Sequence, residues 1–276
     1  MAKLVSIIIP TFNEEIVVER LLSSIKKQSY KDYEIIVIDD GSEDKTVKIA
    51  GKYTGKVFER KHAERSVQRN FGAKKAKGEF VLFLDADMEL SKNVVKDCVL
   101  LIKKEDKVAG IVIPEKSIAR NFWERVKAFE RSFYNLRGDE TTDAARFFRK
   151  SVFEKVGGYN EKITGPEDWD LPETMKKRGY KIERVRSVIY HYERIPTLLS
   201  LLTKKYYYGL RLHRYLDKQK ISLVGPKTIY FLRPVFYRNW KIIIDNPFLS
   251  LAMFTVLFLE MLSGGFGFVV GIIRKI

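Results

Sequence analysis

The chain has 276 residues, of which 45% are hydrophobic, and it contains 17 glycines and 8 prolines. This composition supplies enough apolar side chains for a packed core and excludes a long disordered or collagen-like chain. The only cysteine, Cys98, excludes an intrachain disulfide, and its place in an apolar, helix-like run without a nearby histidine predicts a structural role.

The net charge of +16 is concentrated in one part of the chain. Residues 1–173 carry 32 basic and 30 acidic side chains, residues 174–241 carry 17 and 3, and residues 242–276 carry 2 and 2. The basic segment therefore directly precedes the most apolar stretch. A basic excess is typical of proteins that bind nucleic acid or an anionic membrane, and the adjoining apolar tail favours the membrane.

The first half of the chain alternates strand and helix patterns. Short apolar runs beginning at Leu4, Tyr33 and Phe80 predict three strands, and a helical pattern follows each of them. This βαβα order predicts an α/β fold with a largely parallel sheet covered by helices on both faces. Ligands of such sheets bind beyond the carboxyl ends of the strands.

The pattern becomes less regular in the second half. A helix is predicted over residues 122–135, a strand over residues 144–150, and a further helix and strand before His191. Basic, aromatic-rich helical segments are predicted over residues 196–218 and 226–244. Such segments suit the interface of an anionic bilayer, with packing on the rest of the protein as the alternative.

The tail from Pro247 to Ile273 contains one ionisable side chain, Glu260, and is followed by two basic residues. A helix of this length could cross the roughly 30 Å of hydrocarbon in a bilayer. A hairpin that re-enters one leaflet, turning at the glycines of the tail, and a buried C-terminal helix are the alternatives. No cleavable signal sequence is expected at the N-terminus. Because basic segments beside a membrane helix favour the cytoplasmic side, either membrane arrangement would leave residues 1–241 there.

Two aspartates, Asp85 and Asp87, end the strand that begins at Phe80. Alternation along an extended chain places both carboxylates on one side and Ala86 on the other. Two carboxylates at a strand end suit Mg²⁺ or Mn²⁺, with phosphate oxygens of a substrate completing the coordination. An ordinary acidic loop is the alternative interpretation.

Two further polar clusters follow the first two strands. Asp39 and Asp40 precede a Gly-Ser turn, where a carboxylate could accept hydrogen bonds from a base or a ribose hydroxyl, and a helix cap is the alternative. The first strand ends in residues whose exposed backbone could contact a nucleoside or simply link strand to helix, namely Pro10, Thr11, Asn13 and Glu14.

Two acids, Glu167 and Asp168, follow a Gly-Pro pair at a predicted helix start, where the helix dipole favours an ionised carboxylate. An ionised carboxylate suits a general base that receives a proton from a hydroxyl nucleophile, and helix capping is the alternative. Trp169 beside them could stack on a sugar ring of the acceptor or belong to the core.

Basic side chains supply the remaining candidates. Arg65 and Arg69 lie four residues apart on one predicted helix face, next to Asn70, and could contact donor phosphates. A solvated basic face is the alternative. His191 follows a predicted strand and could be a further metal ligand, although a lone histidine is more often structural. His62 has no supporting sequence context.

Taken in order, these clusters resemble the family 2 glycosyltransferases of GT-A fold. The matching stretches are SIIIPTFNEE, YEIIVIDDGSEDKT, RNFGAKKAKGEFVLFLDAD and FEKVGGYNEKITGPEDWDL, followed by RGYKI. They cover residues 4–182, and their order and spacing make the resemblance specific. The chain lacks the Gln-X-X-Arg-Trp motif of processive members, which favours a single transfer.

The resemblance implies a role for each cluster. The residues from Pro10 to Glu14, together with Asp39 and Asp40, would hold the nucleotide. Asp85 and Asp87 would bind the metal ion. The catalytic base of an inverting single displacement would be Asp168.

The resemblance up to residue 182 and the composition of the remaining chain together predict a domain organisation. Residues 1–195 would form the catalytic domain, with a nucleotide-binding half over 1–114 and an acceptor half over 115–195. Residues 196–246 would form basic amphipathic helices at the membrane interface. Residues 247–276 would form the transmembrane or re-entrant helix.

We therefore expect a glycosyltransferase at the cytoplasmic face of the cell membrane that moves a hexose from a nucleotide sugar to a lipid-linked glycan. GDP-mannose is slightly favoured over a UDP-sugar. Dolichyl-phosphate mannose synthases resemble parts of the chain, but their phosphate acceptor needs no base, so Glu167 and Asp168 favour a hydroxyl acceptor. A polyprenyl-phosphate glycosyl synthase and an inactive nucleotide-sugar-binding protein remain alternatives.

Two other classes fit less well. A haloacid-dehalogenase-type phosphatase also places an Asp-X-Asp motif after an apolar strand, but it would leave the earlier Asp39–Asp40 turn unexplained. Nucleic-acid binding through the basic segment would require affinity that falls steeply with salt. The apolar tail beside that segment argues against it, and no nucleic-acid partner is expected.

Overall fold

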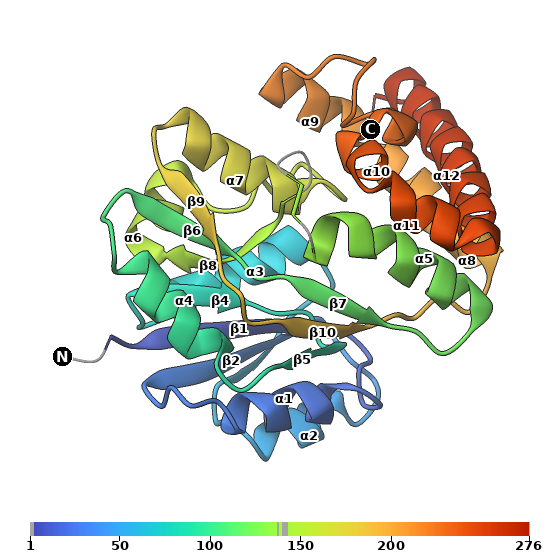
Figure 1. Cartoon of the computed structure of the whole chain (residues 1–276). Coiled ribbons are helices and arrows are strands. Elements are labelled where there is room, and N and C mark those ends of the chain that lie inside the picture. The colour runs from blue at the N-terminus through green and yellow to red at the C-terminus, as the bar shows by residue number, and fades with distance from the viewer. Residues whose placement is uncertain (1–2, 137, 140–142, 276) are drawn as a thin grey trace. The chain divides into compact units, whose positions relative to one another are not determined.

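The computed structural model describes residues 3–136, 138–139 and 143–275, and it divides into two compact units (Figure 1). The sheet unit comprises Met1–Glu115, Ala144–Glu161 and Leu171–His191. The helical unit comprises Lys116–Asp143, Lys162–Asp170 and Tyr192–Ile276. Each unit is assembled from three segments of the chain, so the two interleave along the sequence.

The sheet unit is built on a seven-stranded sheet with the strand order β3-β2-β1-β4-β8-β6-β9. All its neighbouring strands are parallel except β8, which is antiparallel to both β4 and β6. This confirms the predicted α/β fold with a mostly parallel sheet. The strands are β1 (Val5–Thr11), β2 (Tyr33–Asp39), β3 (Val57–Glu59), β4 (Phe80–Phe83), β6 (Val108–Val112), β8 (Ala145–Arg149) and β9 (Lys181–Arg184).

Helices cover both faces of this sheet, because successive strand residues point to opposite sides. Ile7 and Ile9 of β1 belong to one hydrophobic cluster, and Ile8 belongs to the other. The first cluster includes side chains of α1 (Val18–Lys26), α2 (Thr46–Gly51) and α4 (Val94–Ile102). The second includes side chains of α3 (Arg65–Lys75), α6 (Lys150–Val156) and α7 (Glu167–Lys177).

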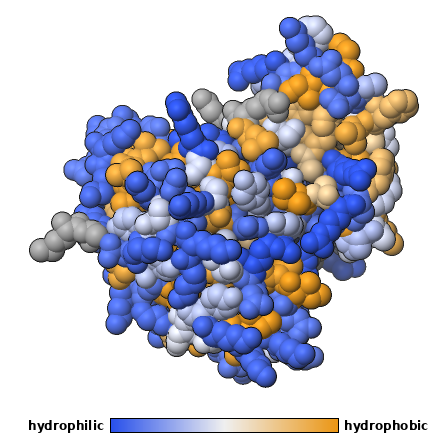
Figure 2. Space-filling view, turned by 60° about the horizontal axis from the view of Figure 1, so that its bottom comes forward, coloured by the Kyte–Doolittle hydropathy of each residue, from blue (hydrophilic) through white to orange (hydrophobic). Residues whose placement is uncertain are grey.

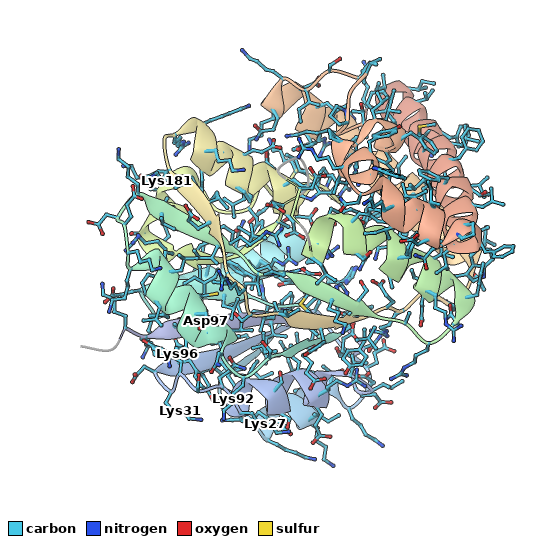
Figure 3. All side chains as sticks on the ribbon, in the orientation of Figure 1. Lys27, Lys31, Lys92, Lys96, Asp97 and Lys181 are labelled. Atoms are coloured by element: carbon cyan, nitrogen blue, oxygen red, sulfur yellow. The ribbon has the colours of Figure 1, made fainter. Side chains whose placement is uncertain are left out.

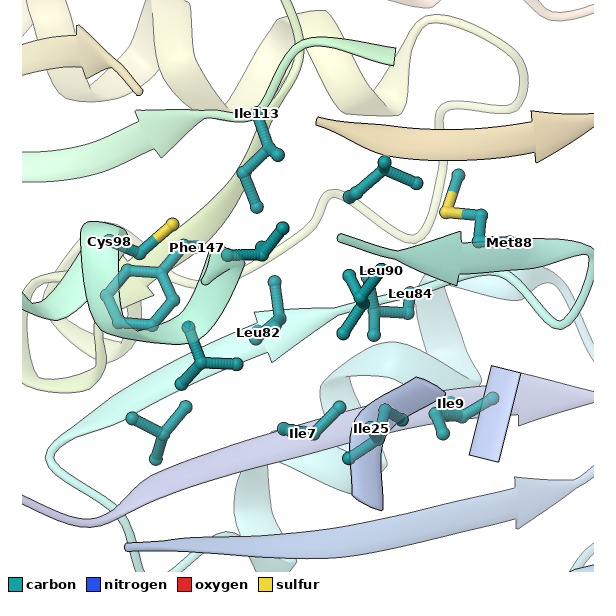
Figure 4. Packing of buried hydrophobic residues seen from close by; sticks show 14 of the residues in the cluster. Ile7, Ile9, Ile25, Leu82, Leu84, Met88, Leu90, Cys98, Ile113 and Phe147 are labelled. Carbon is teal, nitrogen blue, oxygen red and sulfur yellow. The ribbon is translucent and has the colours of Figure 1, made fainter. Parts of the chain in front are cut away.

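Cys98 has the structural role that its sequence context predicts. It lies in the first cluster, beside Phe147, and is fully buried (Figure 4). Burial raises the pKa of its thiol well above the ordinary value, because the thiolate would lose its hydration.

A second, three-stranded sheet has the order β5-β10-β7. Its strands are β5 (Met88–Leu90), β7 (Glu115–Ile118) and β10 (Ile189–Tyr192). β10 runs antiparallel to β5, with His191 opposite Met88. This register brings His191 next to the segment that follows Asp87, although the two are far apart in the sequence.

The helical unit contains α-helices joined by short irregular turns. One of its hydrophobic clusters draws Val126, Phe236 and Met253 from three different helices. The helical elements are α5 (Phe122–Arg131), a π-helix η1 (Ser132–Leu136), α8 (Leu198–Gly209), α9 (Leu212–Gln219), a 3-10 turn η2 (Tyr230–Leu232), α10 (Pro234–Arg238), α11 (Trp240–Asp245) and α12 (Pro247–Ile273).

The helical segments differ in detail from the sequence pattern. The helix predicted over residues 122–135 changes to π-helical geometry at Ser132, and the segment predicted over 196–218 breaks between α8 and α9. α12 passes through its glycines as one continuous helix, so no hairpin forms there. Among the described residues, α12 alone is long and apolar enough to cross a membrane.

Candidate active site

The predicted polar clusters gather along the carboxyl ends of three neighbouring strands. β2, β1 and β4 are adjacent in the sheet, and Thr11 at the end of β1 pairs with Asp39 at the end of β2. Ile8 pairs with Phe83, so Asp85 leaves the same edge just beyond β4. The structure thus brings these clusters to one edge of the sheet unit.

Asp39 shapes the loop that follows its strand. Its side chain is fully buried, and its oxygens accept hydrogen bonds from Thr11 Oγ1 at 2.9 Å and from Ser42 Oγ at 2.6 Å. They also accept bonds from the backbone N–H groups of Gly41 at 3.2 Å and Ser42 at 2.8 Å. These bonds hold the tight turn that the Asp-Asp-Gly-Ser sequence predicts.

The loop after β1 is locked to that turn. Asn13 adopts a left-handed backbone conformation with φ of 53°, and its N–H donates to Ser42 Oγ at 2.8 Å. Its side-chain oxygen accepts from the Glu43 N–H at 2.9 Å. The Glu14 N–H donates to Thr46 Oγ1 at 2.7 Å. The two loops therefore form one rigid edge.

Asp40 contacts His62, for which the sequence predicts no role. One carboxylate oxygen accepts from the Ala63 N–H at 2.9 Å and from the Gln68 amide, and the other lies 2.7 Å from His62 Nδ1. His62 is mostly exposed, and its ring centroid lies 5.1 Å from that of Phe12. Two exposed rings therefore border the turn held by Asp39.

Asp85 is held by two arginines. Arg69 Nη2 lies 2.7 Å from Asp85 Oδ1, and Arg146 Nη1 lies 3.2 Å from Asp85 Oδ2. Burial alone would raise the pKa of Asp85, but the guanidinium groups of Arg69 and Arg146 outweigh it and hold the pKa well below its usual range. Arg65, in the first turn of α3, lowers it further. Arg69 is fully buried and therefore fixed in position, and its contact with Asp85 orients that carboxylate.

Asp87, two residues after Asp85, faces His191. Asp87 Oδ1 is buried, accepts no hydrogen bond from any described residue, and lies 3.5 Å from His191 Nε2. His191 Nδ1 lies 2.9 Å from Glu115 Oε2, and Arg146 Nε donates to Glu115 Oε1 at 2.6 Å. We assign a ring proton to Nδ1, because the Glu115 carboxylate at hydrogen-bond distance can only accept. In a neutral ring, Nε2, which lies on the side of Asp87, is then the nitrogen that could bind a metal ion.

The Glu115 carboxylate remains ionised in this setting. Burial would raise its pKa, but Arg146 and His191 outweigh burial and hold the pKa well below the ordinary value. Glu115 therefore links the two aspartates, since Arg146 connects it to Asp85 and His191 connects it to Asp87.

Asp87 and His191 could hold a divalent cation. A buried carboxylate oxygen without a donor and a nearby imidazole nitrogen are suitable ligands for Mn²⁺ or Mg²⁺. Within the described ranges, no cluster of three or more His, Cys, Asp or Glu side chains forms a metal site. Oxygen atoms of substrate phosphates or water would therefore supply the remaining ligands.

Asn70 lies outside this group of residues. Its side chain donates to the Tyr159 carbonyl at 2.8 Å and accepts from the Tyr159 N–H at 2.9 Å. It also donates to Glu161 Oε1 at 2.9 Å. Asn70 thus joins α3 to the loop that follows α6.

The first turn of α7 carries the second predicted acidic cluster. Glu167 begins the helix, as the sequence predicts, and is buried, whereas Asp168 is half-buried. The sequence analysis missed Asp170, which is almost fully buried and accepts from Lys218 Nζ and Gln219 Nε2, each at 2.6 Å. These bonds anchor the turn to α9 within the helical unit.

Part of the Trp169 side chain is buried by packing within the helical unit. It lies against a cluster of Ile163, Tyr215 and Leu216, and the Arg233 guanidinium lies 6.0 Å from its ring centroid. Its half-buried state leaves part of the ring accessible. The core alternative therefore has direct support, and an acceptor contact stays a prediction.

Part of the positive charge of the sheet unit lies away from the acidic group. Lys27 and Lys31 lie in the connection that enters the amino end of β2, opposite the edge that carries Asp39. Figure 3 shows them with Lys92 and Lys96 on the outer surface of this unit. These exposed lysines are a solvated face.

Comparison with known protein families gives two matches. The family described as glycosyl transferase family 2 matches residues 6–157, which is more than half of the chain. A domain described as the N-terminal domain of galactosyltransferase matches residues 124–198. The first match covers Asp39, Asp85 and Asp87, and the second covers Glu167, Asp168 and His191.

Individual relatives are glycosyltransferases. The poly(ribitol-phosphate) beta-N-acetylglucosaminyltransferase TarS of Staphylococcus aureus is 28% identical over 243 residues, which cover 82% of this chain and 38% of that protein. A PGL/p-HBAD biosynthesis glycosyltransferase of Mycobacterium tuberculosis is 30% identical over 180 residues, which cover 62% of this chain and 68% of that protein. The chain thus spans less than half the length of TarS.

A solved structure supports the same fold. The mannosyltransferase PcManGT from Pyrobaculum calidifontis, in complex with GDP-Man and Mn²⁺, superposes with a TM-score of 0.58 at 18% identity. The match covers 98% of this chain and 79% of that one. At this identity, the likeness shows the fold alone.

Proposed function

This chain belongs to glycosyl transferase family 2, and we propose that it transfers one hexose from a nucleotide sugar to a hydroxyl group of a lipid-linked glycan or glycolipid, with Mg²⁺ or Mn²⁺ as cofactor. The observation that carries the proposal is the Asp87–His191 pair at the carboxyl edge of the sheet, with Asp85 held beside it by two arginines.

The metal-binding residues in this proposal are Asp87 and His191. Both oxygens of Asp85 are engaged by guanidinium groups, so in this proposal Asp85 contributes negative charge beside the metal ion and is not one of its ligands. The bound cation would neutralise the charge that develops on the departing diphosphate. The loops held by Asp39, Asn13 and Asp40 receive the nucleoside, and Arg65 contributes positive charge for the donor phosphates.

Asp168 is the general base in the proposed reaction. Its half-buried carboxylate receives the proton of the acceptor hydroxyl as the oxygen attacks the anomeric carbon, while the bond to the diphosphate breaks with its electron pair. This single displacement inverts the anomeric centre. Glu167 is more deeply buried and begins the helix, so it supports the position of the turn that carries Asp168.

The donor and acceptor are proposed from the relatives. PcManGT was solved with GDP-Man and TarS with UDP-GlcNAc, so both donors are candidates, and the sequence resemblance slightly favours GDP-mannose. A general base at Asp168 favours a hydroxyl acceptor, because a lipid phosphate is already an anion and needs no base. The apolar α12 and the basic segment before it support a lipid-linked acceptor at the cytoplasmic face of the cell membrane.

Donor binding can be tested by thermal denaturation with nucleotide sugars and Mn²⁺. A specific donor at a hundred times its Kd should stabilise the protein by about 2.7 kcal/mol. If neither GDP-mannose nor any UDP-sugar raises the Tm in the presence of Mn²⁺, the proposal is wrong.

The base is tested separately with Asp168→Asn. This variant should keep the donor-induced rise in Tm and lose transfer by roughly 10²–10⁴-fold, because only proton removal is impaired. Asp106→Asn is the matched control, since the Asp106 side chain is fully exposed. Unchanged transfer by Asp168→Asn would favour a phosphate acceptor, and no transfer by the unmodified chain would favour an inactive binding protein.

A further inference from the structure

α12 carries an exposed apolar stripe along its whole length. The stripe residues recur every three, four or seven positions, which places them on one face of a helix about 40 Å long. In Figure 2, hydrophobic residues gather on the helical unit at the upper right. Each member of the stripe is about half or more exposed, and the members are Phe248, Leu251, Phe258, Leu262, Phe266, Val269 and Ile273.

The opposite face of α12 is packed tightly against α8. A Cβ atom added at Gly267 would lie 2.2 Å from the Tyr206 carbonyl oxygen, and one added at Gly271 would lie 1.9 Å from that of Leu210. Ser263 Oγ also donates to the Leu202 carbonyl at 2.7 Å. The backbones of the two helices are therefore in contact, and any side chain larger than that of glycine at these two positions would push the helices apart.

A buried ionic cluster ties the middle of α12 to α5. Glu260 is almost fully buried, and Lys127 Nζ of α5 lies 3.0 Å and 3.1 Å from its two oxygens. Lys127 also pairs with Glu130, and Lys205 of α8 lies 3.7 Å from Glu260. Burial would lower the pKa of Lys127, but Glu130 and Glu260 outweigh burial and raise it.

These two faces are incompatible with a membrane-crossing α12. If α12 left α5 and α8 to cross a bilayer alone, Glu260 would enter hydrocarbon without Lys127, which is strongly unfavourable. If α8 crossed with it, Lys204 and Lys205 would enter the hydrocarbon as well. An orientation parallel to the membrane surface avoids both, because it immerses only the stripe.

We infer that α12 lies in the plane of the membrane surface, with its stripe immersed in an anionic leaflet. Charge complementarity supports this partner, since residues 192–276 carry 13 basic and 4 acidic side chains, a net charge of +9. Exposed Lys204 and Tyr207 lie on α8, and the Tyr206 ring lies 5.8 Å from that of Phe266. Basic and aromatic residues beside an apolar face are typical of interfacial helices.

The first experiment determines the side of the membrane on which the C-terminus lies. The inference deepens the membrane part of the proposed function, and the measurement requires neither donor nor catalysis. Single cysteines are introduced at exposed Lys92 and at Lys275 of the full chain, where buried Cys98 is protected from reagents. Membrane vesicles of known sidedness are treated with an impermeant maleimide.

For an in-plane helix, both positions label from the same side of the vesicle. Labelling of Lys275→Cys and Lys92→Cys from opposite sides would overturn the inference, because it would show a crossing helix. The donor-induced rise in Tm is measured on the same preparations, so loss of the proposed function and failure of the inference remain distinguishable.

The second experiment tests the stripe. Phe258→Ser and Leu262→Ser should each weaken binding to vesicles of anionic lipid by about tenfold, since each removes an apolar side chain that the leaflet would bury. Leu100→Ser is the control, because Leu100 is 55% exposed on α4 of the sheet unit. Unchanged vesicle affinity would overturn the inference, as would a stable dimer in solution that Leu262→Ser dissociates.

Discussion

Glu115 is the residue on which the geometry of the candidate metal site depends most. It accepts a hydrogen bond from His191 and one from Arg146, so it orients the imidazole and connects it to the arginine that contacts Asp85. A carboxylate in this position fixes the histidine tautomer that can bind a metal.

We therefore expect Glu115→Gln to weaken Mn²⁺ binding by roughly 10–100-fold, because the amide no longer fixes the ring orientation and proton of His191. Binding can be measured by calorimetry in the absence of donor. Glu105→Gln is the control, since the Glu105 side chain is 43% exposed and pairs with Lys181. Equal Mn²⁺ affinity in Glu115→Gln and Glu105→Gln would contradict this role.

The sequence predicts the acids at the strand ends but not the residues that hold them. Asp39, Asp85 and Asp87 follow apolar runs, and that local signal suffices. Glu115 and His191, by contrast, are 76 residues apart and meet only through strand pairing. His62 pairs with Asp40 across a loop in the same way. No local pattern marks such contacts.

At the scale of elements, close packing of α8 against α12 depends on glycine at particular positions. Gly267→Ala should lower the free energy of unfolding by about 1–3 kcal/mol, because its Cβ would overlap the Tyr206 carbonyl. Gly265→Ala should raise it by about 1 kcal/mol, since nothing lies within 4 Å and alanine favours helix. Urea denaturation of both variants measures the difference, and a shift in the same direction for both would contradict the packing.

The ionic cluster between α5 and α12 makes the helical unit sensitive to acid. Burial would raise the pKa of Glu130, but Lys127 outweighs burial and lowers the pKa to about 2. A carboxyl whose pKa is lower in the folded state stabilises the fold above its unfolded pKa, near 4.3, and this contribution is lost as the pH falls toward the folded value. Stability should therefore decrease between about pH 4 and pH 2.

Lys127→Met provides the matched measurement. At neutral pH it should lower stability by about 3–5 kcal/mol, because Glu260 and Glu130 would stay buried without their partner. The difference from the unmodified chain should shrink on acidification, as protonation removes the unpaired charges. A difference that is constant with pH, followed by denaturation at several pH values, would contradict the account.

Most elements of the sheet and its largely parallel character could be predicted, whereas the direction of β8 could not. The apolar runs predict β1, β2, β4 and β8, but an apolar run contains no information on whether its neighbours are parallel. The antiparallel β8 is therefore a finding of the structure. The break between α8 and α9 was also missed, because the apolar and basic pattern continues through it.

At the scale of the whole molecule, the interleaving of the two units has a direct consequence for truncation. Val126 and Phe133 of the helical unit precede β8, and they are buried against Met253 and Leu257 of α12. We expect a chain ending at residue 195 to aggregate, because these side chains lose their cover. Gel filtration beside the full chain measures this outcome, and a folded monomer would contradict it.

Family and fold class could be predicted from the first two-thirds of the chain, because five short motifs in fixed order are local signals. The interleaved organisation could not, since it arises from contacts between segments that lie more than a hundred residues apart, as Lys127 and Glu260 do. A linear division of the sequence into consecutive domains does not anticipate such contacts.

The position of β8 also sets an order for folding. β3, β2, β1 and β4 all lie within the first 83 residues, so this half of the sheet can pair as soon as it is synthesised. β6 is made next but has no neighbour in the sheet until β8 and β9 arrive, at residues 145–149 and 181–184. Because long-range pairing is slow, the second half of the sheet should close later, and refolding should show a fast phase followed by a slow one.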